Sequence, residues 1–105
     1  MSYVKVYAGI CGFTTEIRAE KMDETNVKLE IKSDCPVIAK AAEKIKMVNG
    51  VKETGKGLAN SEVVRILAGC GMHTACPVPC GIMKAIEVAL DLALPSDVKI
   101  EVKNQ

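Results

Sequence analysis

The spacing of apolar residues changes partway along the chain, and this change constrains the fold more than any other feature. Up to residue 32, apolar and polar residues alternate, most clearly where Val27, Leu29 and Ile31 are separated by charged residues. Such alternation is typical of strands with one buried face. We therefore predict strands over residues 3–8, 14–20 and 27–32, joined by short turns into an antiparallel meander.

After residue 32 the apolar residues take the spacing of helices. The segment Ser33–Pro36 is typical of a helix start, with polar caps before a proline in the first turn. A second helix is predicted to begin after Asn60 or Ser61 and to end near Gly69. A third is predicted over residues 81–94, and Pro95 would end it.

Two further segments complete the predicted order of elements. Residues 49–59 contain three glycines and are expected to form a loop. Val98, Ile100 and Val102 alternate with charged residues and predict a last strand. The order is therefore βββαααβ, and we predict an α+β two-layer sandwich in which helices cover one face of an antiparallel sheet. The length is that of one domain, residues 1–105.

The charge balance argues against two classes of partner. Lysine and arginine total 14 against 13 acidic residues, so the net charge is +1, and aromatic residues make up 3%. A nucleic-acid-binding protein needs a basic surface or stacking aromatics, and a membrane surface attracts basic clusters. We therefore expect no nucleic-acid or membrane partner, although a protein partner or homo-oligomer stays open. No apolar leader is visible, and a cytoplasmic location is predicted.

Five cysteines in 105 residues point to chemistry at sulfur. Three of them, Cys70, Cys76 and Cys80, share a short segment rich in glycine and proline with the only histidine, His73. Buried cysteines are usually small apolar residues, but three so close together do not form a core pattern. Thiolates bind zinc and iron–sulfur clusters and are good nucleophiles.

The spacing in this segment is similar to that of bacterial ferredoxin loops. Cys70, His73, Cys76 and Cys80 follow the pattern C-x2-H-x2-C-x3-C, with histidine in the position of the second cysteine. Cys11 in the first turn and Cys35 at a helix start are further donors. We expect three or four of these thiolates to meet at one edge of the sheet and to hold zinc or an iron–sulfur cluster.

A thiol-based redox protein or enzyme is the alternative. Cys35 and Cys80 lie where helices are predicted to begin, and the positive end of a helix favours the thiolate. Either could attack a substrate while a neighbouring cysteine resolves the mixed disulfide. A non-catalytic interaction domain with structural cysteines is the third possibility, so an enzymatic activity is left undecided.

Four landmarks resemble the TSCPD domain family, whose small domains occur alone or at the end of some ribonucleotide reductases. The matching positions, within residues 9–90, are Cys11, Cys35-Pro36, Cys70-Gly71, Thr74-Ala75-Cys76-Pro77 and Lys84-Ala85. The resemblance implies that Cys11, Cys35, Cys70 and Cys76 are metal ligands. The chain lacks the family's serine and aspartate beside Cys76.

A second resemblance rests on the segment Ala-Cys-Pro-Val-Pro at residues 75–79. The chain is similar there to small uncharacterised cysteine-rich proteins of methanogenic archaea and anaerobic bacteria. That group supplies no function. The ferredoxin-like spacing and the TSCPD pattern choose different ligand sets, but both include Cys70 and Cys76, which are therefore the firmest candidates.

Overall fold

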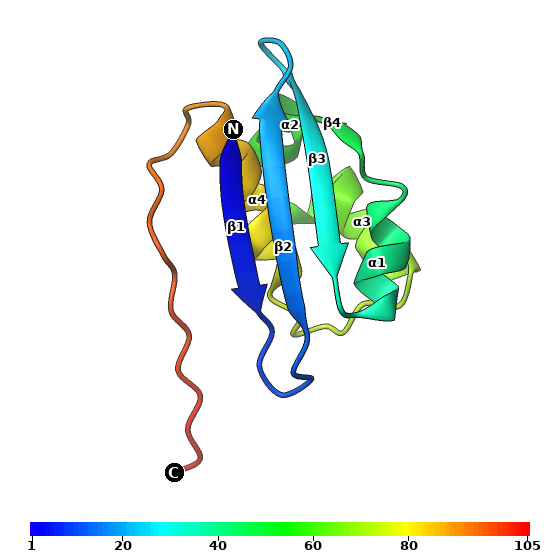
Figure 1. The fold of residues 1–105 in the computed structure, drawn as a ribbon, viewed down its shortest axis with the longest axis vertical. Coiled ribbons are helices and arrows are strands. Elements are labelled where there is room, and N and C mark those ends of the chain that lie inside the picture. Colours follow the sequence, from blue (N-terminus) through cyan, green and yellow to red (C-terminus); the bar gives the residue numbers. More distant parts are fainter.

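Three strands form the antiparallel meander that the alternating residues predict, in a computed structural model that describes all of residues 1–105. They are β1 (Ser2–Tyr7), β2 (Thr14–Lys21) and β3 (Asn26–Ser33). A short fourth strand, β4 (Met47–Asn49), pairs antiparallel with β3, and the order across the sheet is β1-β2-β3-β4. β1 is therefore an edge strand that pairs only with β2 (Figure 1).

One face of the sheet carries rows of charged side chains that match across the strands. Glu16 lies opposite Lys32, and Arg18 lies opposite Glu30. Arg18 also lies opposite Tyr3, with its guanidinium 4.9 Å from the ring centroid. Cross-strand pairs of opposite charge and cation–π contacts stabilise a sheet surface in water. This face needs no covering layer.

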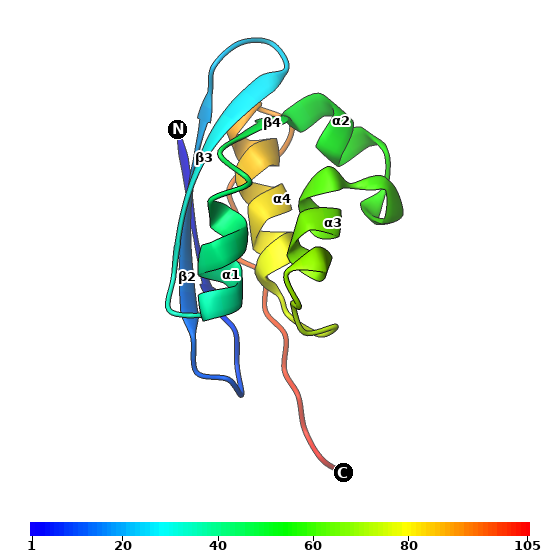
Figure 2. The same ribbon diagram turned by 90° about the vertical axis from the view of Figure 1, so that its right-hand side faces the viewer.

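The helices cover the other face of the sheet, as the two-layer prediction requires (Figure 2). They are α1 (Pro36–Ala42), α2 (Gly50–Gly55), a 3-10 turn η1 (Leu58–Asn60), α3 (Glu62–Gly69) and α4 (Val78–Ala89). α4 crosses β1 and β2, while α1 lies beside β3. The α+β class is thus confirmed, with an antiparallel four-stranded sheet.

The core lies between these two layers and is entirely aliphatic. Burying aliphatic side chains contributes roughly 1.5–3 kcal/mol for each large residue, which makes this layer contact the main source of stability. The buried cluster contains Ile17, Ala19, Val27, Leu29, Ile38, Ala41, Ile45, Val63, Leu67, Val78, Ile82, Ala85, Ile86 and Leu90.

Two glycines allow close packing at the two ends of α4. A Cβ added at Gly81 would lie 2.5 Å from Val6 Cγ2, so the backbone of α4 lies directly against the Val6 side chain of β1. Near the other end of α4, a Cβ on Gly50 would lie 2.7 Å from Leu90 Cδ1. The hydroxyl of Ser2 donates a hydrogen bond of 2.7 Å to the carbonyl of Ala85 and fixes the middle of α4 beside β1.

Three parts of the predicted secondary structure are wrong: one loop, the limits of the last helix, and the last strand. Residues 49–59 are not a loop, because they contain β4's last residue, α2 and η1. The last helix covers 78–89 rather than 81–94, since prolines are tolerated in a first turn. No strand forms over 98–102: Val98, Ile100 and Val102 are 60%, 73% and 90% exposed and have no partner strand. Alternation marks the faces of a strand but supplies no partner.

No helix in the structure has both the length and the apolar character needed to cross a membrane.

Candidate functional site

The fold brings all five cysteines to one end of the molecule, which we call the cysteine end. Cys11 lies in the β1–β2 turn, and Cys35 is the N-cap of α1 directly after β3. Cys70 is the C-cap of α3, Cys76 precedes α4, and Cys80 lies in its first turn. In both views the β1–β2 turn, the start of α1 and the α3–α4 loop lie toward the lower end (Figures 1 and 2).

Specific contacts join these segments at the cysteine end. The amide of Asp34 donates to the carbonyl of Thr14 at 3.1 Å, and the Asp34 carboxylate accepts from the Thr14 amide at 3.3 Å. They hold the start of α1 against the start of β2. Gly81, beside Val6, holds the start of α4 against the last part of β1. Residues that are up to 69 positions apart, Cys11 and Cys80, therefore belong to one region.

The cysteines divide into two groups by burial. Cys35, Cys70 and Cys76 are half-buried and pack against the same hydrophobic core, as does Met72. Cys11, Cys80 and His73 are exposed. The half-buried group comes from two connections, β3–α1 for Cys35 and α3–α4 for Cys70 and Cys76, and all three residues pack against the hydrophobic core.

The side chains at this end do not form a completed coordination sphere. All five cysteines are free thiols. No group of three or more histidine, cysteine, aspartate or glutamate side chains lies close enough together to hold a metal ion. The predicted ligands thus share a region of the fold, and which of them bind a metal stays a prediction.

Glycines in the connections give the cysteine end room to rearrange. Gly9 and Gly12 flank Cys11, and Gly71 follows Cys70; all three have positive φ, of 94°, 74° and 92°, and open space around them. Within the α3–α4 loop, the Cys76 amide donates to the carbonyl of His73 at 3.1 Å.

A second cluster of functional groups lies at the opposite end of the helical layer, around Glu53 of α2. Its carboxylate is 8% exposed and accepts from the Ser61 hydroxyl at 3.0 Å. It also accepts from the amides of Glu62 at 3.0 Å and Val63 at 2.7 Å. The Ser61 hydroxyl in turn accepts from the Val64 amide, so the first turn of α3 is fully capped.

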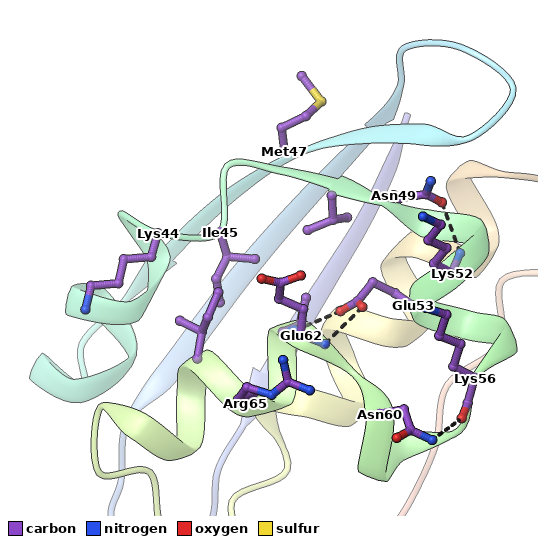
Figure 3. A pocket seen from close by; sticks show the side chains of 13 residues that line it. Lys44, Ile45, Met47, Asn49, Lys52, Glu53, Lys56, Asn60, Glu62 and Arg65 are labelled. Carbon is purple, nitrogen blue, oxygen red and sulfur yellow. Dashed lines mark hydrogen bonds between the residues drawn. The ribbon is translucent and has the colours of Figure 1, made fainter.

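The sequence predicts Asn60 or Ser61 as the cap of this helix, and the structure has Ser61; the role of Glu53 is not predicted. The sequence shows only that a carboxylate, Glu53, precedes Ser61 by eight residues. Because the residues between them are predicted to form a loop, this spacing does not indicate a contact between Glu53 and the start of the helix. The role of Glu53 follows from the fold, since α2 and η1 turn the chain back so that Glu53 reaches the start of α3 (Figure 3). A buried carboxylate at a helix N-terminus is favourable because it faces unpaired N–H groups.

A groove of about 360 Å³ opens above this cluster, well away from the cysteines. Four cationic side chains line it, namely Lys44, Lys52, Lys56 and Arg65, together with the carboxylates of Glu53 and Glu62 (Figure 3). Its most buried polar group, Glu53, is already committed to the amides of α3. The groove is therefore the outer surface of the hydrogen-bonded cluster around Glu53, and its lining supplies no reactive group.

The chain was compared with known proteins. A model of a family of unknown function (DUF6951) matches residues 2–102. No curated protein and no solved structure matches. The TSCPD resemblance is therefore wrong, because the family model that matches nearly the whole chain is that of a different family. The order of the cysteines and a Cys-Pro helix start were therefore not enough to identify the family.

Proposed function

The chain belongs to the DUF6951 family, whose function is unknown, and we propose that it is a small metal-binding protein with a thiolate-ligated centre at the cysteine end. The observation that carries the proposal is the gathering of five free cysteines from three parts of the chain, the β1–β2 turn, the start of α1 and the segment from the end of α3 to the start of α4, at one end of the fold. A bound zinc ion or iron–sulfur cluster would join these connections, as structural metal sites do. No activity is assigned by the family.

Burial selects the central ligands in this proposal. Cys35, Cys70 and Cys76 are half-buried and pack against the hydrophobic core, so water reaches them less than it reaches the exposed cysteines. The fourth donor comes from the exposed group of Cys11, Cys80 and His73. This set rests on burial and position, and it takes nothing from the TSCPD pattern.

The donor set fits a soft metal by its chemistry, whereas its present geometry does not form a site. Binding therefore requires the β1–β2 turn and the α3–α4 loop to close on the half-buried thiols. The glycines beside Cys11 and Cys70 permit that closure. Thiols must also stay reduced, and we place the protein in the reducing cytosol, where disulfides are rare.

Metal analysis of the protein purified without oxygen tests the proposal. We expect about one zinc per chain in a colourless sample, or iron with acid-labile sulfide in a brown one. The double variant Cys70→Ser/Cys76→Ser should lose the metal because it removes two central thiolates. Met72→Leu is the matched control, since Met72 is half-buried in the same loop and offers no thiolate. A metal-free wild type, or full loading of the double variant, would refute the proposal.

A thiol-redox role is the second candidate. It is favoured by the exposure of Cys11 and Cys80 beside three less accessible thiols, an arrangement in which an attacking and a resolving cysteine can differ in access. Alkylation rates measured against pH distinguish it. A redox protein should have one thiol that reacts well below pH 8, while five thiols all titrating near about 8.5 would exclude it.

A further inference from the structure

The C-terminal segment has the pattern of a strand, and the sheet has an edge strand, β1, with no partner on its open side. Val98, Ile100 and Val102 are highly exposed, and no backbone hydrogen bond joins residues 93–105 to the rest of the chain. The family match extends to residue 102 and thus includes them. Apolar residues at three alternate positions are costly to leave in water, so this segment is expected to have a partner.

The charged residues of the segment already share one face, as a strand requires. Glu101 contacts Lys99 at 2.8 Å through one carboxylate oxygen and Lys103 at 3.8 Å through the other. The three apolar residues alternate with them and therefore fall on the opposite face. As a strand, the segment would have one apolar face that could be buried and one charged face that could remain in water.

The free edge of β1 presents a matching pair of faces. Val4 and Val6 point to the helical layer and are only half-buried, since no strand covers them on the open side. Tyr3, Lys5 and Tyr7 point to the solvated face. An edge strand also leaves every second backbone N–H and C=O unpaired along its open side.

We propose that residues 98–103 of one chain pair antiparallel with β1 of a second copy, so that two chains exchange C-terminal strands in a symmetric dimer. One register of this pairing places opposite charges opposite each other, each tyrosine ring opposite a lysine, and apolar residues opposite apolar residues. In it Tyr3 pairs with Lys103, Val4 with Val102, Lys5 with Glu101, Val6 with Ile100 and Tyr7 with Lys99.

The same chemistry already operates on the other side of β1. There Tyr3 lies opposite Arg18, and Lys5 lies opposite Glu16. The cation–π contact of Arg18 with Tyr3, at 4.9 Å, shows that this row accepts a cation over a ring. In the proposed register, Lys103 would lie opposite Tyr3 and Glu101 opposite Lys5, as Arg18 and Glu16 of β2 do on the other side of β1.

Direction favours the second copy over the chain's own edge. The C-terminal segment starts near the beginning of β1 and runs toward its end, as Figure 1 shows, so it could meet its own β1 only in parallel. Every existing pair in the sheet is antiparallel, and parallel pairing is less stable per residue. A second copy related by a two-fold axis perpendicular to β1 brings its C-terminal segment to this edge in the antiparallel direction.

Light scattering during size-exclusion chromatography tests the exchange in the full chain. The wild type should be a dimer, and Ile100→Lys/Val102→Lys should raise its dissociation constant at least about tenfold, because two charges would face the core. Leu58→Lys is the control: it places a lysine at another exposed apolar residue, 62% exposed in η1, and should leave the dimer intact.

Hydrogen exchange separates the remaining possibilities. Exchange of strands predicts that amides of residues 98–102 and β1 are protected together and lose protection on dilution. A monomer would overturn the proposal, whether these amides are protected by the chain's own edge or unprotected. A dimer unaffected by the double lysine variant would also overturn it, since association would then use another surface. The metal content is a separate readout, so this result does not depend on the proposed function.

Discussion

The helices that begin at one end of the helical layer have side-chain caps, and those that begin at the other end do not. α2 and α3 begin at the end that holds Glu53, and their N-caps, Asn49 and Ser61, both accept a backbone hydrogen bond. α1 and α4 begin at the cysteine end, where the N-caps Cys35 and Pro77 make no side-chain cap hydrogen bond. We call the first the capped end.

The N-cap residues at the capped end therefore stabilise the fold by capping, whereas those at the cysteine end do not. A serine, asparagine or aspartate cap is worth about 1 kcal/mol relative to a residue that cannot accept. Cys35 has the extended backbone of an N-cap, with φ −79° and ψ 121°, yet carries a thiol there. The caps thus stabilise α2 and α3 at the capped end, whereas α1 and α4 begin at the cysteine end without a side-chain cap.

Glu53→Gln should have the largest effect, at the capped end. The glutamine side chain is neutral and has one acceptor oxygen. If this oxygen keeps the bonds from Ser61 and Val63, the NH2 group faces the Glu62 amide, which loses its acceptor. We expect a loss of about 2–3 kcal/mol in the free energy of unfolding, measured with urea.

The control for this variant is Glu62→Gln. Glu62 is exposed, and its carboxylate makes no salt bridge or hydrogen bond, so its loss should change stability by less than about 0.5 kcal/mol. Equal effects of the two substitutions would mean that the capped end owes its stability to general charge and not to this carboxylate.

Gly81→Ala should come next, because it probes how the cysteine end is seated on the sheet. The new methyl group would meet Val6 Cγ2 at 2.5 Å and force α4 away from β1. Overpacking of this kind costs about 1–3 kcal/mol. Gly69→Ala is the matched control, since a Cβ there meets nothing within 4 Å. If thermal unfolding shows both variants as stable as the wild type, α4 is not held closely at this end.

Exchanging the two caps should give smaller effects of opposite sign. Cys35→Ser should raise the stability of the metal-free protein by about 0.5–1 kcal/mol, because the hydroxyl can accept from the first turn of α1. Ser61→Cys should lower it by at least about 1 kcal/mol, since Ser61 both caps α3 and donates to Glu53. Two losses in urea titrations would show that the thiol of Cys35 itself serves the fold.

The smallest effect concerns the β2–β3 turn. The Asn26 side chain, with the backbone amides of Asn26 and Thr25, donates to Asp23 and lowers its pKa to about 2 from 3.8. The pKa is lower in the folded state, so the stabilisation is complete above pH 3.8 and is lost as the pH falls through about 2. Amide shifts of Thr25 and Asn26 should titrate near the lower value; a midpoint near 3.8 would contradict this turn geometry.

Much of the fold could be predicted because its determinants are local. Alternation located the three long strands, and Ser61 located the start of α3. Glycine misled the prediction at Gly50, where it serves close packing against Leu90 and begins a helix instead of a loop. Partners could not be predicted, because the pattern of residues 98–102 specifies faces and no neighbour.

The candidate site could be predicted only in part for the same reason. Helix starts and turns carry Cys11, Cys35 and Cys76, and their positions follow from the order of the elements. Which side chains become buried depends on how α3 and α4 pack, and that separates the half-buried Cys70 and Cys76 from the exposed Cys80. The proximity of the thiols to one another depends on loop geometry that local patterns do not encode.

Thermal unfolding of the reduced protein, with excess Zn²⁺ and with a chelator, tests the proposed thiolate centre most directly. A ligand present at about 1,000 times its dissociation constant adds about 4 kcal/mol of stability. For a domain of this size that should raise Tm by more than about 10 °C, and Cys70→Ser/Cys76→Ser should abolish the rise. Equal Tm values in the two conditions would contradict the account, because a metal that joins these connections must stabilise the fold.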